Sequence, residues 1–341
     1  MKKIKTVLIG LGTVNRGVLG ILVNQKKKIQ DTYGLELIIV GVADSSGVAV
    51  NTTGFDYQEL IQLKNQRRHV KELVGYQHEI FVENISDHIE AELLIESSPG
   101  NLKTGQPGLQ VVSRALRKGW SVVLANKAPL VIGFDDLHQL AKIHGGRVAY
   151  SATVCGGLPV INMLQRDLKL ATLLSLKGIF NATTNYILKE LGIGDSFENA
   201  IKEAQRIGAA EADPSHDVNG HDTANKLFII MKSFTDFAGA ITDIHVEGIQ
   251  NITSRQVLEA MKTGHKIKLL AIAEKINNQW ALSVKPAVVE TNSFLGTCDG
   301  WEMGIELKTD LYENISMKNY EADPLGTSAA VLRDILEIVK D

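Results

Sequence analysis

The chain has 341 residues, enough for two domains with separate hydrophobic cores. Hydrophobic residues make up 44% of it and charged residues 22%, and a net charge of −3 excludes the basic surface that nucleic acids or anionic membranes need. No apolar stretch is long enough to span a membrane, and the charged N-terminus lacks a secretory signal, so we expect a cytoplasmic protein. Two cysteines, Cys155 and Cys298, are too few for a disulfide framework or a cysteine metal site.

The first 150 residues alternate short β-branched runs with helical patterns. We expect strands at 4–9, 35–43, 93–96, 121–125 and 147–150. Between the first two, an amphipathic helix is expected because apolar residues recur at helical spacing, at Val14, Val18, Ile21 and Leu22. Such alternation predicts a parallel sheet with crossover helices.

After Ser151 the pattern changes to a mixture of helices and strands. Helices are expected at 159–165, 185–191, 197–207 and 222–237, and strands at 173–180 and 302–308. Residues 266–276 and 280–285 flank the pair Asn277-Asn278 and predict a β-hairpin. The last stretch, 327–340, predicts an amphipathic helix.

A glycine turn follows the first strand. Gly10 permits the tight turn, and Gly12 lets a pyrophosphate approach the backbone at the positive end of the following helix. The third position of this fingerprint is Asn15 rather than glycine. We favour dinucleotide binding over a plain strand-to-helix turn because the turn lies in a βαβ context.

Two further segments are candidates for contact with a dinucleotide. Asp44 ends the second expected strand, where a carboxylate can accept hydrogen bonds from an adenosine ribose and favour NAD; a simple turn aspartate explains it equally well. Ser97 and Ser98 follow the third expected strand, where their backbone and hydroxyls could meet a nicotinamide ribose.

Two lysines lie in polar surroundings. Asp222 and Lys226 are spaced four residues apart on an expected helix and share a face, and the loop before them carries Glu211 and Asp217. This loop suits the binding of an ammonium group. Lys127 follows a strand at the carboxyl edge of the expected sheet, where ligands bind in open α/β folds. A neutral lysine amine can accept a hydroxyl proton as a hydride leaves, and the charged form can polarise a carbonyl in the reverse direction.

These residues together resemble the homoserine dehydrogenase family over nearly the whole chain. The matching segments occur in the family's order: 10–14 (GLGTV), 125–130 (ANKAPL), 152–159 (ATVCGGLP), 178–188 (GIFNATTNYIL) and 211–227 (EADPSHDVNGHDTANKL). The resemblance implies NAD(P)-dependent interconversion of L-homoserine and L-aspartate 4-semialdehyde, in threonine and methionine biosynthesis. It also implies a short form without the C-terminal regulatory domain and without an aspartokinase.

The resemblance assigns a role to each matching residue. Lys127 and Lys226 would be catalytic, with Lys127 also contacting the cofactor. Substrate binding would fall to Thr183, Glu211, Asp217 and Asp222. The cofactor would be bound by Gly10, Gly12, Thr13, Val14, Asp44, Ser97, Ser98 and Gly326.

The chain departs from the family's pattern at several positions. Ala182 replaces the glycine usual before Thr183, and the glycine-rich turn before the last helix is reduced to 324–327. Ser151 stands where many members have the glutamate of a monovalent-cation site. The other ligands would be the main-chain carbonyls of Val154, Gly156 and Leu158, and the sequence leaves open whether a cation binds there.

The resulting expectation is an α/β protein. A Rossmann-like NAD(P)-binding domain would span 1–150, and a mixed α+β substrate-binding and dimerisation domain 151–318. The helix in 319–341 would return to the nucleotide-binding domain, and family members of this kind pair as homodimers. Two alternatives stay open: a related amino-acid semialdehyde reductase, and a non-catalytic homologue that binds a dinucleotide or a metabolite.

Overall fold

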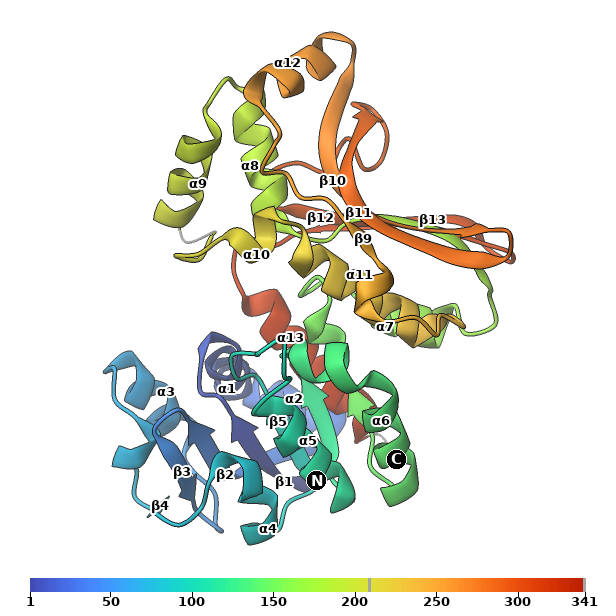
Figure 1. Cartoon of the computed structure of the whole chain (residues 1–341). Helices are drawn as coiled ribbons and strands as arrows, with labels where there is room; N and C mark the ends of the chain where they lie inside the picture. Colours follow the sequence, from blue (N-terminus) through green and yellow to red (C-terminus); the bar gives the residue numbers. More distant parts are fainter. Residues whose placement is uncertain (208–209, 340–341) are drawn as a thin grey trace. The chain divides into compact units, whose positions relative to one another are not determined.

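The computed structural model describes residues 1–207 and 210–339 (Figure 1). The chain divides into two compact units. Unit 1 comprises Met1–Gly157 and Pro324–Asp341, and unit 2 comprises Leu158–Asp323. The domain limits expected from the sequence, after residues 150 and 318, lie a few residues before these divisions. None of the described helices combines the length and the apolar character that a membrane crossing needs.

Unit 1 is built on one seven-stranded sheet in the order β4-β3-β2-β1-β5-β6-β7. Five strands run parallel, and the hairpin strands β3 and β4 extend the sheet antiparallel beyond β2. The five expected strands are confirmed, but β3 and β4 were not expected, because a four-residue and a two-residue strand carry too little pattern. The strands are β1 (Lys2–Ile9), β2 (Leu35–Asp44), β3 (Gly47–Val50), β4 (Tyr76–Gln77), β5 (Leu93–Glu96), β6 (Ser121–Leu124) and β7 (Val148–Ala149).

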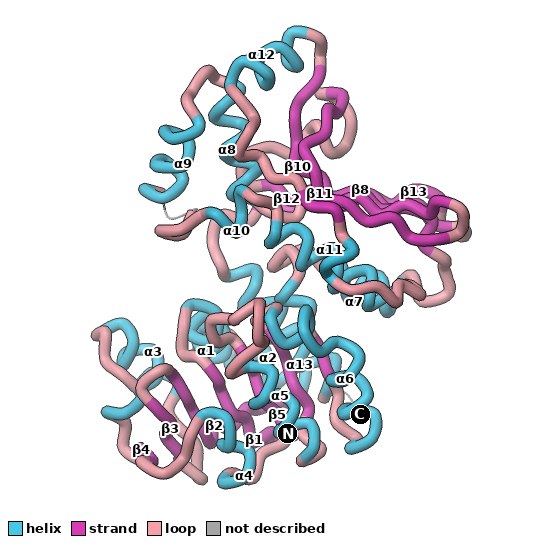
Figure 2. The backbone as a smooth tube through the Cα atoms, viewed as in Figure 1, coloured by secondary structure: helices cyan, strands magenta, loops and turns pink. Residues whose placement is uncertain are grey.

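Helices flank this sheet (Figure 2). They are α1 (Thr13–Asn24), α2 (Lys26–Tyr33), α3 (Tyr57–Asn65), α4 (Ile85–His88), α5 (Gly108–Arg117), α6 (Ala128–His144) and α13 (Leu325–Ile338), with short 3₁₀ turns at Val70–Glu72, Val82–Asn84 and Ser151–Thr153. The apolar face of α1 packs with β2 and α13 in one core that includes Leu19, Ile39 and Val331. The expected C-terminal helix is confirmed; its last expected residue, Lys340, lies outside the described residues.

The C-terminal helix packs closely on the first helix. The Ser328 hydroxyl on α13 donates a hydrogen bond of 3.0 Å to the carbonyl of Val14 on α1. A Cβ atom on Gly17 would lie 2.2 Å from that hydroxyl oxygen, so a larger residue there would displace the Ser328 side chain. This contact places the first turn of α13, with Gly326, beside the start of α1.

Unit 2 contains a six-stranded sheet in the order β13-β12-β8-β10-β11-β9. Its strands are β8 (Leu173–Ile179), β9 (His245–Val246), β10 (His265–Ile276), β11 (Gln279–Glu290), β12 (Glu302–Thr309) and β13 (Glu313–Tyr320). The predicted hairpin is confirmed as β10 and β11; Asn277 and Asn278 turn the chain with φ values of 50° and 65°, as a two-residue type I′ turn requires. Strands β9 and β13 were not expected.

The helices of unit 2 lie beside this sheet (Figure 1). They are α7 (Val160–Asn162), continued by a π-helical turn (Met163–Asp167), α8 (Ala182–Gly192), α9 (Phe197–Arg206), α10 (Ser215–Val218), α11 (His221–Phe234) and α12 (Ser254–Lys262), with a 3₁₀ turn at Ile241–Asp243. The helices expected from the sequence are confirmed with small shifts of their ends. Helices α10 and α12 were not expected, and α10 lies in the segment before α11 that was expected to be a loop.

The two faces of this sheet differ in exposure. Ala271 pairs with Val284, and both are fully buried. On the opposite face, neighbouring strands present Lys177, Ile272 and Glu306 side by side, and none of these three is buried. One face is therefore the core of unit 2, and the other is only partly covered within the chain.

A buried lysine joins α8 to the loop before β12. The Lys268 side chain is 2% exposed, and its Nζ donates to Asn185 Oδ1 at 2.8 Å and to the Cys298 carbonyl at 2.5 Å. Asp299 lies 3.3 Å from the same ammonium group. Burial lowers the pKa of Lys268, and the negative charge of Asp299 opposes that shift. The cluster ties the loop to the helix that also carries Thr183.

Replacing Lys268 with alanine should lower the free energy of unfolding by about 3 kcal/mol, because the buried Asn185 amide oxygen and Cys298 carbonyl would lose their ammonium donor. Lys266→Ala is the matched control. Lys266 contacts the other oxygen of Asp299 at 3.1 Å but is 23% exposed, so its loss should cost about 1 kcal/mol or less. Denaturant unfolding of both variants measures the difference, and equal losses would contradict the buried role of Lys268.

Candidate active site

The glycine turn of unit 1 forms an open cradle at the start of α1. Gly10 adopts a φ of 78°, and a Cβ there would lie 2.8 Å from the Ser98 backbone. Gly12 precedes α1 with no side-chain cap, and a Cβ on it would meet nothing within 4 Å. No side chain caps the first turn, which begins with Thr13 and Val14, and the first N–H groups of a helix have no partner within it. This geometry fits a pyrophosphate.

The Asn15 side chain stabilises that turn. Its side chain is fully buried, and its Nδ2 donates to the carbonyls of Gly10 at 2.6 Å and Ile9 at 3.3 Å. An asparagine in the place of the fingerprint glycine therefore supports the cradle by hydrogen bonds to the turn. The space over Gly12 remains open in its presence.

Asp44 already has partners within unit 1. One carboxylate oxygen accepts hydrogen bonds from the backbone and hydroxyl of Ser46, and the other accepts from Lys64 and from the Val70 backbone. Burial raises the pKa of Asp44, but these donors, Lys64 first, hold it below its usual value. A ribose hydroxyl would have to share these oxygens with the protein's own donors. Lys64 was not singled out in the sequence, because a lysine inside a helix gives no signal of that contact.

The remaining cofactor candidates of unit 1 lie at the ends of β5 and β6. The Ser97 backbone donates to the Ile9 carbonyl at 2.9 Å, and its hydroxyl lies 3.2 Å from the Gly10 carbonyl. Lys127 directly precedes α6, and its carbonyl accepts from Leu130 at 3.0 Å in the first turn of that helix. The structure thus brings the glycine turn (Gly10 and Gly12), the serine loop (Ser97 and Ser98) and the segment with Lys127 to the same edge of the sheet.

The predicted cation loop is held by a carboxylate from α13. The Ser151 backbone and hydroxyl donate to the two oxygens of Asp334, at 2.7 and 2.5 Å. The Leu158 carbonyl accepts a hydrogen bond of 2.8 Å from Val160. Across residues 1–207 and 210–339, no cluster of three histidine, cysteine or acidic side chains could hold a metal ion. The carbonyl site at Val154, Gly156 and Leu158 stays a prediction.

In unit 2, one amide joins two of the predicted carboxylates. Asn181 Nδ2 donates to Asp217 at 2.8 Å and to Asp222 at 2.9 Å. The other side-chain atom, Oδ1, accepts from the Thr184 backbone at 2.8 Å and so caps the start of α8. Sequence reasoning gave Asn181 no role, although an asparagine directly before a helix is a recognisable cap.

Lys226 is held in a nearly closed environment. Its side chain is 12% exposed, and its Nζ lies 2.5 Å from the Phe180 carbonyl and 2.7 Å from Asp222. The i, i+4 pairing expected from the sequence is therefore present, but as a largely buried contact anchored to the end of β8. This anchoring fixes the direction of the amine.

The other substrate candidates differ in burial. Burial, followed by repulsion from Asp222, raises the pKa of Asp217, while the Asn181 amide lowers it. Thr183 is 8% exposed in the first turn of α8. Glu211 is exposed in the segment before α10, and no hydrogen bond joins its carboxylate to Asn181, Asp217 or Lys226 among the described residues.

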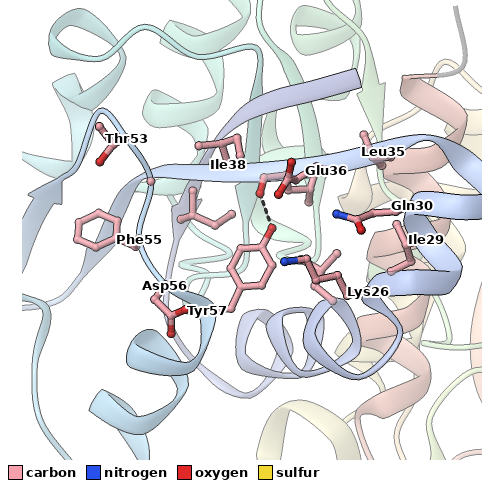
Figure 3. A pocket seen from close by; sticks show the side chains of 14 residues that line it. Lys26, Ile29, Gln30, Leu35, Glu36, Ile38, Thr53, Phe55, Asp56 and Tyr57 are labelled. Carbon is pink, nitrogen blue, oxygen red and sulfur yellow. Dashed lines mark hydrogen bonds between the residues drawn. The ribbon is translucent and has the colours of Figure 1, made fainter. Parts of the chain in front are cut away.

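A pocket of about 360 Å³ lies elsewhere on unit 1, between α1, α2 and the first half of β2 (Figure 3). Tyr57 points into it and donates a hydrogen bond to the Leu37 carbonyl. Burial, with repulsion from Glu36, raises the pKa of Tyr57 to about 12. None of the predicted site residues lines this pocket, which borders the end of β2 opposite to Asp44.

Comparison with known proteins identifies one family over most of the chain. The family model "Homoserine dehydrogenase" matches residues 159–336. A homoserine dehydrogenase of Methanocaldococcus jannaschii is 32% identical and covers 97% of each chain. An NAD(+)-dependent homoserine dehydrogenase of Pseudomonas canavaninivorans is 27% identical over 99% of this chain and 97% of its own. The model "Glutamate/Leucine/Phenylalanine/Valine dehydrogenase" matches only residues 24–98, without the glycine turn.

Solved structures share the architecture. A putative homoserine dehydrogenase from Archaeoglobus fulgidus superposes with a TM-score of 0.87 at 32% identity, covering 98% of this chain and 99% of its own. A hyperthermophilic archaeal homoserine dehydrogenase in complex with NADPH has the same fold, with a TM-score of 0.85 at 23% identity over 99% and 98% of the two chains. The predicted fold class, a Rossmann-like domain with a mixed α+β domain, is confirmed.

Asn181→Ala should cost more stability than the loss of a helix cap, about 3 kcal/mol, because the buried Asp222 and the partly buried Asp217 lose their shared donor. Ser196→Ala is the matched control: Ser196 caps α9 through Asn199 at 3.2 Å and contacts neither carboxylate, so about 1 kcal/mol is expected. Unfolding free energies by denaturant titration make the comparison. Similar losses in the two variants would show that Asn181 is only a cap.

Proposed function

Because the chain belongs to the homoserine dehydrogenase family, we propose that it catalyses the reversible NAD(P)-dependent oxidation of L-homoserine to L-aspartate 4-semialdehyde. The observation that carries this proposal is the oriented, nearly buried Lys226 amine beside Asp222 and Asn181. A semialdehyde reductase of other specificity is disfavoured by the segment 211–227, and a non-catalytic homologue by the intact lysines and carboxylates.

Unit 1 would bind the dinucleotide. The N–H groups at the start of α1 and the open space over Gly12 suit a pyrophosphate, and the serine loop at Ser97 suits the ribose that carries the nicotinamide. When bound, the nicotinamide accepts or returns the hydride. The names of relatives include both NAD(+) and NADPH, so both cofactors are candidates here.

Lys226 would move the proton of the substrate hydroxyl. Its Nζ is held by the Phe180 carbonyl and by Asp222, so the amine is already oriented before substrate binds. In oxidation the neutral amine accepts the hydroxyl proton; in reduction the ammonium returns a proton to the aldehyde oxygen. Lys127 would share that proton and orient the reacting oxygen from the carboxyl edge of unit 1.

The carboxylates of unit 2 would bind the substrate's ammonium group. Glu211 supplies an exposed carboxylate for this ammonium group. Asp222 would both bind the ammonium group and orient the Lys226 amine through its ion pair with Lys226. Thr183 would contact the substrate from the start of α8, and Asp217 would support the site through Asn181.

The partly covered face of the unit 2 sheet supports a homodimer. Lys177 on that face is exposed, and its neighbours Ile272 and Glu306 are only partly buried, although Ile272 packs against a small apolar cluster of its own chain. Pairing of two such faces would cover it symmetrically. We propose a cytoplasmic location, since neither Cys155 nor Cys298 is in a disulfide bond, as is usual in a reducing compartment.

Lys226→Ala and Lys127→Ala should each lower turnover by about a hundredfold or more, because proton transfer is felt in the transition state. Glu211→Ala should mainly raise the Michaelis constant for homoserine, because an ammonium anchor binds ground state and transition state alike. Absorbance of the reduced nicotinamide, followed with homoserine and each cofactor, gives all three values.

Lys202→Ala is the control, since Lys202 is an exposed lysine on α9 outside the network and should leave turnover unchanged. Near-normal turnover in both catalytic lysine variants would show that the lysines are structural. No turnover of homoserine by the unaltered protein with either cofactor would overturn the proposed activity.

Sedimentation velocity tests the assembly. We expect a homodimer at micromolar concentration, and Ile272→Glu should shift it toward monomer, because a charge would be introduced on the face that is proposed to pair. A stable monomer of the unaltered chain would contradict the proposed pairing.

A further inference from the structure

Glu96 occupies the switch point of the unit 1 sheet. It is the last residue of β5, pairs with Ile9 at the end of β1, and is 0% exposed. From β1 the chain crosses to β2 on one side, whereas β6 and β7 lie on the other side of β5. In such sheets the crevice at the switch point is where ligands bind. A buried carboxylate at this place therefore needs an explanation.

The backbone and side chain of Glu96 connect two segments of the site. Its Oε1 accepts hydrogen bonds from the Ser98 hydroxyl and, at 3.0 Å, from the Ser98 backbone. Its carbonyl accepts from the backbone of Ala125 at 2.8 Å and lies 3.4 Å from that of Asn126. The serine loop and the segment before Lys127 thus share Glu96 as their common acceptor.

The second carboxylate oxygen faces the Asn126 amide across a glycine. A Cβ atom on Gly108 would lie 3.2 Å from the Glu96 Cδ and 3.0 Å from Asn126 Nδ2, so both groups border the same small space. Oε2 and Nδ2 are both buried, and neither has a hydrogen-bond partner within the described part of the chain. Acceptor and donor are complementary to each other.

The orientation of Asn126 is fixed from its other side. Its Oδ1 accepts from the Ala128 backbone at 2.9 Å, at the start of α6, and lies where a Cβ on Gly100 would come within 2.2 Å. The amide nitrogen must therefore point toward Glu96. Because Lys127 lies between Asn126 and Ala128 in the chain, the contacts that hold the Asn126 side chain also restrict the backbone of Lys127.

We infer that Glu96 is a positioning residue, which holds the Ser98 loop and the Asn126-Lys127 segment together at the dinucleotide edge. This inference rests on the proposed function, since it assigns that edge to the cofactor. Glu96 need not touch substrate or cofactor: it acts through Ser98 and Asn126.

The protonation of Glu96 supplies a second readout. Burial raises the pKa of Glu96 to about 7, against the lowering effect of Ser98 and Asn126, and no charged side chain of the described residues contributes to the shift. The folded protein therefore binds this proton more tightly than the unfolded chain does. The stability that the group contributes is fully present below a pH of about 4.5 and is lost as the pH rises through about 7.

Charge-swap variants test the inference. Glu96→Gln places an amide nitrogen against the Asn126 amide, and Asn126→Asp places a carboxylate against Glu96; each should weaken dinucleotide binding about tenfold at pH 8. The double variant Glu96→Gln/Asn126→Asp restores donor against acceptor and should return the affinity to within about threefold of the unaltered protein. Titration calorimetry with NAD(H) and NADP(H) measures it, and Glu90→Gln, on an exposed side chain, is the control.

Unfolding temperatures between pH 5 and 8 complete the experiment. The unaltered protein should lose stability relative to Glu96→Gln as the pH rises through about 7. Wild-type affinity in both single variants, or no recovery in the double variant, would overturn the positioning role. Should Glu96→Gln fail to fold, rescue of folding by Asn126→Asp in the double variant supports the pairing, and failure of that rescue overturns it. A protein that binds dinucleotide but does not oxidise homoserine would refute the proposed activity and leave this inference standing.

Discussion

Two parallel strands that end side by side determine the geometry of unit 1. Ile9 and Glu96 are register partners at the ends of β1 and β5, and the chain must leave these ends without burying unsatisfied backbone groups. The Ser97 backbone satisfies the Ile9 carbonyl, and Gly10 turns away with a positive φ because the Ser98 backbone leaves no room for a side chain. The open cradle at the start of α1 follows from this packing.

In unit 2, the two neighbouring carboxylates of Asp217 and Asp222 must be stabilised against desolvation and mutual repulsion. Asp217 and Asp222 repel each other in a poorly solvated site, and that repulsion would prevent both from being ionised without compensation. One Asn181 amide bonds to both, and Lys226 pairs with Asp222. The same contacts that make the burial tolerable also orient the amine, so stability and the proposed chemistry depend on one network.

The departures from the family's pattern have local physical explanations. The Asn15 side chain donates a hydrogen bond to the Gly10 carbonyl in the turn, a contact that a glycine at this position could not make. The Ser151 hydroxyl donates a hydrogen bond to Asp334 on α13. A carboxylate therefore contacts the position where many family members carry a glutamate. Ala182 is the first residue of α8, where alanine favours the helix more than glycine does. None of these three changes fills the space over Gly12.

The sequence by itself determined the parallel sheet, the hairpin at Asn277-Asn278, the family and the residue types of the site, because periodicity, turn chemistry and motif order are local properties. The partners of those residues were decided only by the tertiary structure. That Asp44 is bonded to Lys64, that Asn181 serves two carboxylates, and that Glu96 is buried against Asn126 all depend on contacts between segments distant in the chain. Short strands such as β4 also escaped prediction, since two residues form a strand only when a neighbouring strand is already in place.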